Sequence, residues 1–262
     1  MGEFSDKVCL VTGGASGIGR ATCQLFAEKG ASVVVADIDA NGGQKTAREL
    51  GSQARFLSLD VTSESEWENA VSMAIERFGR LDVLVNSAGI GINGNFEETS
   101  LEDWKRVLEV NLTGTFLGCK HGIRGIKQSD GGGALVNMSS MAGIVGGDDI
   151  AAYSASKGGV TLLTKSVALH CAKYNLRIRC NAVCPTYVDS EMLDPVAEQL
   201  GGRDIMRAGM AELVPLGRLA LPEDIANVIM FLASPGAAMI TGAAIMVDGG
   251  QTAGVPGRHA ED

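Results

Sequence analysis

The chain has 262 residues, 45% of them hydrophobic, which is enough for one large domain with a sizeable core. Acidic residues number 31 and basic residues 22, giving a net charge of -9 without a basic cluster, which argues against nucleic-acid binding. The N-terminus lacks a signal sequence, and no apolar stretch of about eighteen residues occurs. We therefore expect a soluble, cytoplasmic protein with no membrane contact.

Short apolar runs alternate along the chain with longer segments of helical periodicity. We expect strands at residues 8–11, 32–36, 55–59, 81–85, 134–138, 177–183 and 243–247. We expect helices ending at residue 29 and covering residues 42–50, 64–78, 101–127 and 151–174. This alternation predicts the α/β class: one domain spanning 1–262, with a Rossmann-type, doubly wound parallel β-sheet of about seven strands and helices on both faces. Ligands bind such sheets at the carboxyl ends of the strands.

A glycine-rich stretch from Thr12 to Gly19 joins the first strand to the first helix. Glycines allow the backbone to approach a pyrophosphate, which the N–H groups of the following helix can bind. The stretch also resembles a nucleoside-triphosphate loop, but Arg20 and Ala21 stand where that loop needs Lys and Ser or Thr. The sequence therefore favours a dinucleotide over a nucleoside triphosphate.

Asp37 ends the second strand, 18 residues after Gly19, where a Rossmann-type fold places the carboxylate that binds the adenosine ribose. The alternative is a carboxylate in a surface turn. If Asp37 faces the ribose, a 2′-phosphate would meet like charge, at about 4 kcal/mol per charge pair for an effective dielectric near 20. This predicts NAD rather than NADP, with Arg20 as the nearest cation that could reach a phosphate.

The cysteines lie among apolar neighbours without a Cys-x-x-Cys pair, which predicts buried free thiols in a reducing compartment rather than disulfides or a zinc site. There are six of them: Cys9, Cys23, Cys119, Cys171, Cys180 and Cys184. The three histidines, His121, His170 and His259, stand isolated in the sequence, so we expect no metal site.

Tyr153 and Lys157 are one helical turn apart and share a face, and Ser140 precedes the tyrosine by 13 residues. A lysine and a second cation could supply the roughly 4 kcal/mol that makes a phenol useful near pH 7. Tyr153 would then be a general acid and base. The alternatives are an ordinary amphipathic turn and, from Ser154 and Lys157, the Ser-x-x-Lys pattern of penicillin-binding hydrolases, whose companion motifs are missing.

Residues 189–222 form the longest segment outside the regular alternation, and they carry many methionines and leucines. We interpret this segment as a lid over a nonpolar substrate, with a packing extension as the alternative. Residues 252–262 are expected to form a C-terminal tail.

Six motifs in one order and spacing make the sequence resemble a short-chain dehydrogenase/reductase over about residues 5–250. They are Thr12-Gly13-x-x-x-Gly17-x-Gly19, Asp60-Val61, Asn86-Ser87-Ala88-Gly89, Asn111, Ser140 and Tyr153-x-x-x-Lys157. Two positions depart from the family pattern: Ser87 replaces an asparagine, and Thr186 replaces the glycine that usually follows Pro185. A Cβ at residue 186 would alter the shape of the substrate side.

The resemblance implies a role for each matching residue. Catalysis would rest on Tyr153 as acid and base, Lys157 on the nicotinamide ribose and lowering the tyrosine pKa, Ser140 on the substrate oxygen, and Asn111 in a water relay. The pyrophosphate side of the cofactor would be held by Gly13, Ser16, Gly17, Ile18 and Gly19. The adenine would be flanked by Asp60 and Val61, and the path to the nicotinamide lined by Asn86, Ala88 and Gly89. The carboxamide would meet the segment containing Pro185, Val188 and Ser190.

The resemblance extends to bacterial hydroxysteroid and cyclic or aryl-alkyl alcohol dehydrogenases, through stretches such as residues 101–104 and 116–120. It implies hydride transfer between NAD and a nonpolar secondary alcohol or ketone. It also implies a homo-oligomer, commonly a tetramer paired through its long helices and last strands. Two alternatives stay open: a 3-oxoacyl thioester reductase of the same family, and a catalytically idle nucleotide-binding scaffold.

Overall fold

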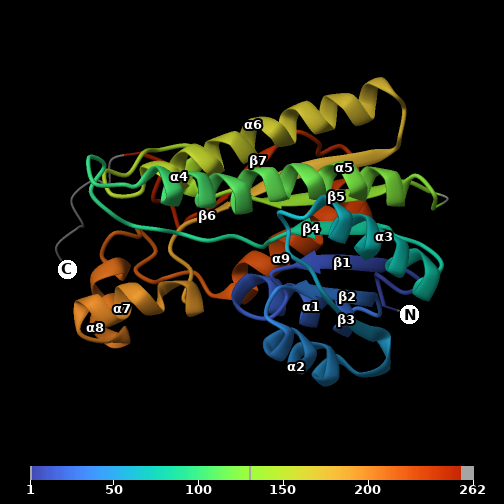
Figure 1. Ribbon diagram of the computed structural model, residues 1–262, viewed down its shortest axis with the longest axis horizontal. Helices are drawn as coiled ribbons and strands as arrows, with labels where there is room; N and C mark the ends of the chain where they lie inside the picture. The colour runs from blue at the N-terminus through green and yellow to red at the C-terminus, as the bar shows by residue number, and fades with distance from the viewer. Residues whose placement is uncertain (1, 130, 255–262) are drawn as a thin grey trace.

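The computed structural model describes residues 2–129 and 131–254, and its seven strands form one parallel sheet (Figure 1). The strand order is β3-β2-β1-β4-β5-β6-β7. The strands are β1 (Val8–Thr12), β2 (Ser32–Asp37), β3 (Ala54–Ser58), β4 (Val83–Asn86), β5 (Gly133–Met138), β6 (Ile178–Pro185) and β7 (Ala244–Val247). The predicted α/β class and doubly wound parallel sheet are confirmed.

Both faces of the sheet are covered, which explains why its central strands are unbroken apolar runs. In β1, Cys9 and Val11 belong to one core cluster, whereas Val8 and Leu10 belong to the other. Successive side chains of a strand point to opposite faces, so each strand contributes to both cores.

Helices lie on both faces of the sheet (Figure 1). On one face α1 and α9 supply Phe26 and Ile225 to the core, and on the other α3 and α5 supply Trp67 and Ile126. None of the helices within the described residues is long and apolar enough to cross a bilayer. They are α1 (Gly17–Glu28), α2 (Ala40–Leu50), α3 (Glu64–Phe78), α4 (Leu101–Leu108), α5 (Gly114–Ile126), α6 (Ala151–Lys173), α7 (Asp194–Leu200), α8 (Arg203–Ala211) and α9 (Pro222–Ala233).

The long helix expected over residues 101–127 is present, but a π-helical turn at Glu109–Thr113 divides it into α4 and α5. The Gly114 N–H donates to the Glu109 carbonyl, five residues back, instead of four. Asn111, one of the predicted site residues, lies within this turn and is fully buried. π-Helical turns occur frequently at functional sites, and this one carries a candidate catalytic side chain.

The expectation of an irregular segment at residues 189–222 was wrong. The short helices α7 and α8 occupy much of it and form a projection at one end of the molecule (Figure 1). They have a small core of their own, in which Ala197, Met206 and Leu219 are buried. Two consecutive glycines, Gly201 and Gly202, adopt positive φ values of 90° and 137° and break the helical pattern between α7 and α8.

Helix α9 was not predicted, because Pro222 was interpreted as the end of a loop. A proline at the first helical position starts a helix without losing a hydrogen bond. The Asp224 carboxylate accepts the Leu221 N–H at 2.8 Å, which satisfies a backbone donor at the helix start. The helix then buries Ile225, Ile229 and Leu232 against the sheet.

All six cysteines are free and buried, as predicted. Burial raises the pKa of the Cys9 and Cys23 thiols well above the usual range, so these groups stay protonated and chemically inert. The predicted tail at residues 252–262 lies outside the described residues from position 255 onward. At its start, Thr252 donates from both its N–H and its hydroxyl to Asp248.

Candidate active site

The strand order reverses between β1 and β4, and the loops that follow these two strands meet there. Thr12, at the end of β1 and 1% exposed, joins them: its hydroxyl accepts hydrogen bonds from the N–H groups of Ser87 (3.0 Å) and Ala88 (3.1 Å). Thr12 begins the glycine motif, and its sequence context predicted no separate role for it. The hydroxyl holds one edge of the crevice that the reversal creates.

The glycine loop has the close contacts that require glycine. Gly13 and Gly17 adopt positive φ values of 69° and 47°. A Cβ at Gly13 would lie 3.0 Å from the Ala88 nitrogen, and one at Gly19 would lie 2.0 Å from the Gly13 carbonyl oxygen. The loop therefore packs tightly against its neighbours and leaves Ser16 exposed and Ile18 partly exposed at the start of α1.

Asp37 ends β2 beside this loop. One carboxylate oxygen accepts the Ala15 N–H at 2.9 Å and the other accepts the Asp39 N–H at 2.9 Å. A carboxylate can accept about four hydrogen bonds, so both oxygens keep a lone pair for a further donor. Asp37 thus shapes the glycine loop as well as offering acceptors at the end of the strand.

Asp60 and Val61 follow β3. The Asp60 carboxylate accepts hydrogen bonds from the N–H and hydroxyl of Thr62, at 2.9 and 2.8 Å. Val61 is 8% exposed and packs against the start of α5, where a Cβ at Gly114 would lie 2.8 Å from its side chain. Val61 therefore presents little side-chain surface, and a ligand would meet mainly the Asp60 side of this turn.

The Asn86 side chain, expected to line the cofactor path, is turned into the interior. It is 3% exposed and donates to Asn137 at 2.8 Å. A Cβ at Gly118 would lie 2.0 Å from its side-chain oxygen, so α5 passes directly over it. The side chain therefore fixes the end of β4, and the Ala88 and Gly89 backbone, partly exposed, lies nearer the crevice.

Tyr153 and Lys157 lie in the first turns of α6, as predicted, with the Lys157 ammonium 5.5 Å from the centre of the tyrosine ring. The lysine is 4% exposed and donates to the Met138 carbonyl at 2.8 Å. A Cβ at Gly89 would lie 3.4 Å from this ammonium. The structure therefore brings the end of β5, the loop after β4 and the start of α6 together around the lysine.

Ser140 follows β5, and its hydroxyl lies beside Tyr153, where it partly offsets the rise in the tyrosine pKa that burial causes. The same hydroxyl accepts the Ala142 N–H at 3.1 Å, which starts a short 3-10 turn. The neighbouring Ser139 points elsewhere and binds the Lys157 carbonyl at 2.9 Å. The Ser139 hydroxyl is therefore occupied by the backbone of α6, and Ser140 remains the candidate for binding a substrate oxygen.

Asn111 is bound to both sides of the site. Its side chain accepts the Ile90 N–H at 2.8 Å and donates to the Ile90 carbonyl at 2.9 Å and the Ser156 hydroxyl at 3.0 Å. Ser156 in turn donates to the Tyr153 carbonyl at 2.7 Å. Ser156 was not predicted as a site residue, but it connects the π-helical turn to the backbone at Tyr153.

Burial shifts the pKa values of the tyrosine and the lysine in opposite directions and moves them apart. Burial raises the pKa of Tyr153, and the Ser140 hydroxyl opposes the increase. Burial lowers the pKa of Lys157 from 10.5 to about 8. The protein's own groups thus move the tyrosine pKa in the direction opposite to the one expected, so a cation beyond Lys157 is needed to favour the phenolate.

The segment after β6 returns to the glycine loop. A Cβ at Gly17 would lie 3.2 Å from the Ser190 Cβ. Val188 is 8% exposed and pairs with Ala220, whereas Pro185 is the last residue of β6. Thr186 is not among the described non-glycine residues with positive φ, so the expected glycine can be replaced there without backbone strain.

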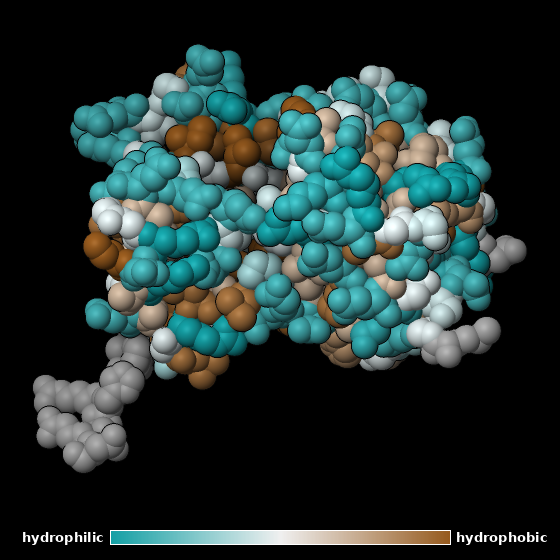
Figure 2. All heavy atoms as spheres, turned by 90° about the horizontal axis from the view of Figure 1, so that it is seen from below, coloured by the Kyte–Doolittle hydropathy of each residue, from teal (hydrophilic) through white to brown (hydrophobic). Residues whose placement is uncertain are grey.

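Apolar side chains surround the projection formed by α7 and α8, at the left of Figure 2. Several large apolar side chains of this projection, of the segment around it and of the loop after Ser140 are exposed. They are Ile144, Val145, Met192, Leu200, Ile205, Leu213 and Leu216. The projection and this loop therefore offer apolar surface to a ligand or partner.

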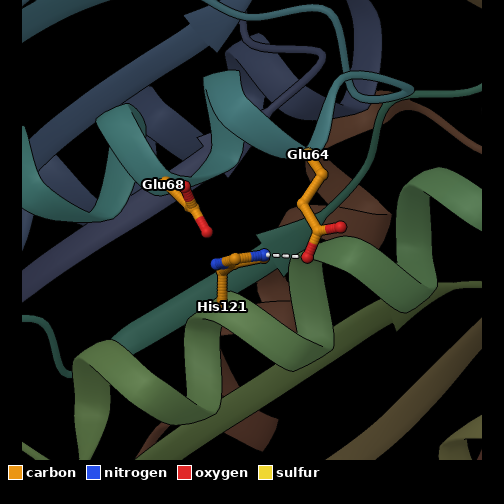
Figure 3. A group of neighbouring side chains, drawn as sticks. All are labelled: Glu64, Glu68 and His121. Atoms are coloured by element: carbon orange, nitrogen blue, oxygen red, sulfur yellow. Dashed lines mark hydrogen bonds and ion pairs between the residues drawn. The ribbon is translucent and has the colours of Figure 1, made fainter.

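One group of side chains has the composition of a metal site, although no metal site was expected. Potential ligand atoms of Glu64, Glu68 and His121 lie within 4.8 Å of one another (Figure 3). His121 is 2% exposed and is bonded to Glu64 at 3.1 Å. Lys120 also binds Glu64, and its hydrogen bond, followed by that of His121, lowers the pKa of this carboxyl. The Lys120 ammonium thus already neutralises the Glu64 carboxylate. The hydrogen bonds of Lys120 and His121 to Glu64 join α5 to α3.

Comparison with known proteins agrees with this geometry. A family model described as enoyl-(acyl carrier protein) reductase matches residues 13–252. The chain is 43% identical to a cis-4-hydroxycyclohexanecarboxylate dehydrogenase of Sinomonas cyclohexanicum, over 97% of the chain and 100% of the relative. It is 39% identical to a cyclopentanol dehydrogenase of Comamonas testosteroni, over 97% and 100%. It is also 39% identical to an NADP-dependent (R)-specific alcohol dehydrogenase of Lentilactobacillus kefiri, over 96% and 98%.

The chain therefore belongs to the short-chain dehydrogenase/reductase family, whose members are oxidoreductases that use a nicotinamide cofactor.

Replacing Lys157 by Met is expected to stabilise the fold at pH 7. The fall in the lysine pKa from 10.5 to about 8 means that burying the charged lysine opposes folding by about 3 kcal/mol. Methionine removes this cost, but it also loses the hydrogen bond to the Met138 carbonyl, which is worth about 1 kcal/mol. Urea unfolding should show an increase of about 1–2 kcal/mol in the free energy of unfolding.

This gain should shrink as the pH rises from 8 to 10.5, because over that range the unfolded lysine keeps its proton while the folded one loses it. Lys165→Met, an exposed position on the same helix, is the matched control and should show no such pH dependence. A Lys157→Met variant less stable than the wild type at pH 7 would contradict the stated cost of burying the ammonium.

Proposed function

We propose that the protein catalyses hydride transfer between NAD and a nonpolar secondary alcohol or its ketone. The observation that carries this proposal is the grouping of the Tyr153, Ser140 and Lys157 side chains beside the crevice where the strand order reverses. Three unlike polar groups meet there, two from the first turns of α6 and one from the loop after β5. This grouping suits a small alcohol that must be deprotonated and oriented.

The residues present fit a dinucleotide. The glycine loop approaches its neighbours so closely that side chains at Gly13 and Gly19 would clash, and the Gly17 N–H is aimed at an anion, a carboxylate oxygen 3.1 Å away. Asp37 keeps lone pairs for ribose hydroxyls at the end of β2. A nicotinamide cofactor bound along this loop would supply the hydride acceptor.

Proton transfer is the step that the protein's own groups perform. Ser140 orients the substrate oxygen, and Tyr153 takes the proton from the hydroxyl during oxidation or returns it during reduction. Burial raises the pKa of Tyr153 and lowers that of Lys157 to about 8, so near neutral pH the phenol keeps its proton beside a mostly protonated ammonium. An oxidised nicotinamide ring, when bound, would supply the further positive charge that favours the phenolate.

Asn111 and Ser156 act as positioning residues in this proposal. Their hydrogen bonds hold the loop at Ile90 and the backbone at Tyr153 in fixed relation. The proposed proton relay to solvent would begin at the Lys157 ammonium and pass beside Asn111, since a Cβ at Gly89 would be within 3.4 Å of both side chains.

The preference for NAD rests on two observations. The Asp37 carboxylate, at the end of β2, would repel a 2′-phosphate, and the guanidinium of Arg20 is paired with Glu191 at 2.9 Å rather than directed toward Asp37. The Lentilactobacillus kefiri relative is NADP-dependent, so the family scaffold accepts either cofactor and local charge must decide.

A cyclic secondary alcohol is the proposed substrate class. Relatives named for cis-4-hydroxycyclohexanecarboxylate and cyclopentanol share 43% and 39% of residues with the chain, and the loop after Ser140 exposes the apolar Ile144 and Val145. A thioester reductase is the second candidate, favoured by the description of the matching family model.

We also propose that the protein works as a tetramer, supported by the exposed Leu162 and Leu169 of α6. Its six free thiols support a reducing compartment, the cytoplasm.

The substrate class is tested by a panel of cyclopentanol, cyclohexanol, hydroxysteroids and acetoacetyl thioesters, assayed with NAD or NADH. We expect the highest kcat/KM on the cyclic alcohols. Activity confined to thioesters would reject the alcohol assignment, and failure of NADH to bind in a fluorescence titration would reject nicotinamide chemistry altogether.

Replacing Tyr153 by Phe should lower kcat by about 10²-fold or more, because general acid and base catalysis contributes about that factor. NADH binding should persist, since the phenol oxygen is removed without changing the fold around the ring. Tyr174→Phe, at an exposed tyrosine just beyond the end of the same helix, should leave kcat unchanged. Near-normal turnover of Tyr153→Phe would exclude the tyrosine as the acid and base.

Replacing Asp37 by Asn removes the charge but keeps an oxygen for one of the two N–H groups that the carboxylate binds. The ratio of kcat/KM with NAD to that with NADP should fall by about 10- to 100-fold, a conservative fraction of the 4 kcal/mol charge term. Asp39→Asn, an exposed carboxylate two residues away, is the control and should change the ratio far less. An unchanged ratio in Asp37→Asn would remove this carboxylate from cofactor selection.

A further inference from the structure

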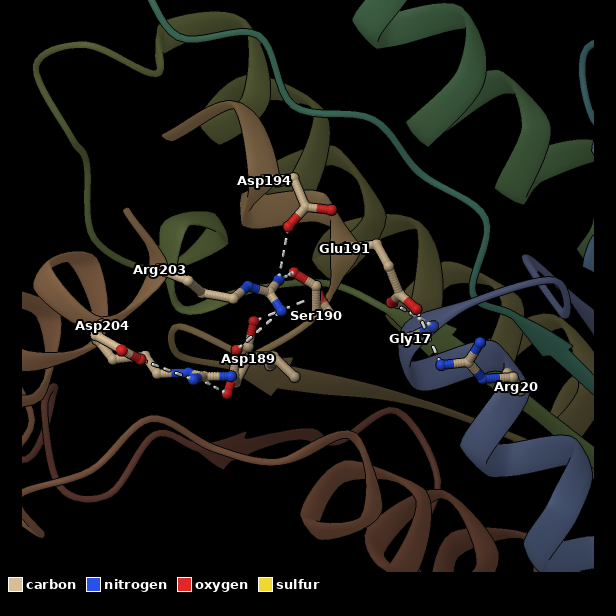
Figure 4. Close-up of polar contacts among 10 residues, drawn as sticks. Gly17, Arg20, Asp189, Ser190, Glu191, Asp194, Arg203 and Asp204 are labelled. Atoms are coloured by element: carbon tan, nitrogen blue, oxygen red, sulfur yellow. Dashed lines mark hydrogen bonds and ion pairs between the residues drawn. The ribbon is translucent and has the colours of Figure 1, made fainter. Parts of the chain in front are cut away.

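Glu191 places a carboxylate on the glycine loop. One of its oxygens accepts the Gly17 N–H at 3.1 Å, and the other accepts a hydrogen bond from the Arg20 guanidinium at 2.9 Å (Figure 4). The two partners lie at the start of α1, whereas Glu191 follows β6, 174 residues later than Gly17. Glu191 is thus an anion that the chain itself delivers to the first turn of α1.

The charge of Glu191 is favoured at this position. Burial raises the pKa of its carboxyl, but the hydrogen bond from its own backbone N–H, the charge of Arg20 and the Gly17 N–H outweigh that effect and hold the pKa below its ordinary value. The N-terminus of an α-helix attracts anions through its free N–H groups and its dipole. The Glu191 carboxylate therefore uses the same two features that a phosphate group would use.

The turn that carries Glu191 is braced from the other side (Figure 4). Arg203 of α8 donates to the Ser190 carbonyl and pairs with Asp194 at 2.9 Å, and Arg207 pairs with Asp189 at 2.8 Å. These contacts fix the backbone on both sides of Glu191, so its side chain reaches the loop with little loss of conformational freedom. The contact to α1 is therefore prearranged by the α7–α8 projection.

We propose that Glu191 competes with the cofactor diphosphate for the first turn of α1, so that the dinucleotide must displace this carboxylate in order to bind. The inference rests on the proposed nicotinamide function and concerns a residue that no motif of the sequence singled out. One N–H cannot serve both anions, and a carboxylate beside a diphosphate is repelled. Glu191 then reduces the affinity of the site for every ligand that carries the diphosphate.

The size of the effect follows from the strength of the contact. Glu191 is held by a half-exposed ion pair with Arg20 and by the hydrogen bond from the Gly17 N–H. These contacts keep the carboxylate on the glycine loop in most molecules, but they are weak enough for a ligand to displace it. The apparent dissociation constant is the intrinsic one divided by the fraction of molecules in which Glu191 is displaced. Removing the carboxylate should therefore tighten diphosphate binding by about three- to tenfold.

The experiment measures binding of ADP-ribose, NADH and adenosine by calorimetry to the wild type, Glu191→Gln and Glu191→Ala. ADP-ribose and NADH should bind both variants about three- to tenfold more tightly, whereas adenosine, which carries no phosphate, should bind all three proteins equally. Glu198→Gln on α7 removes the same charge from an exposed residue of the projection and should leave every affinity unchanged within about twofold.

Three results would overturn the proposal. ADP-ribose affinities equal to that of the wild type, with NADH binding intact, would reject the competition alone. Equal gains for adenosine, or for Glu198→Gln, would show a general structural or electrostatic effect instead of displacement at the loop. Failure of the wild type to bind NADH or ADP-ribose would reject the proposed nicotinamide function and the competition together.

Discussion

The buried ammonium of Lys157 is the constraint around which the site is arranged. At 4% exposure it has lost most of its hydration, and it donates a hydrogen bond to the Met138 carbonyl. Burial of a charge is unfavourable, and the lysine pKa of about 8 expresses this. The surrounding segments must therefore be rigid enough to keep the group in place.

Several segments provide that rigidity by close approach. Ser139 binds the Lys157 carbonyl, and a Cβ at Gly143 would lie 2.7 Å from the lysine backbone. Gly89 brings the loop after β4 to the ammonium from another side. The positions where a side chain is excluded are thus as important for the site as the polar groups themselves.

The sequence was sufficient for the sheet because its central strands, such as β1, β2 and β4, are buried and read as apolar runs between polar turns. The π-helical turn at Glu109–Thr113 could not be predicted, because one extra residue in a single turn leaves the apolar pattern nearly unchanged. The helices α7 and α8 could not be predicted either, because they are short and separated by two glycines. Among the candidate site residues, Tyr153 and Ser140 could be proposed from the sequence because motif spacing singles them out. Glu191 was not, because its meaning depends on a contact between distant parts of the chain.

The sign of the tyrosine pKa shift could not be predicted for a related reason. Spacing places Lys157 one turn from Tyr153, but it does not report that the ammonium binds Met138 or that burial acts on both groups. Desolvation depends on everything packed around a residue, and so it is available only from the fold.

The π-helical turn at Glu109–Thr113 also affects how the molecule is layered. An added residue rotates everything that follows it by about 100° around the helix axis. Accordingly, α4 packs against α6, whereas α5 packs against α3 and β4. One continuous helix therefore presents two differently oriented faces, and a deletion that restored regular α-helical geometry would turn the wrong side of one half toward its neighbours.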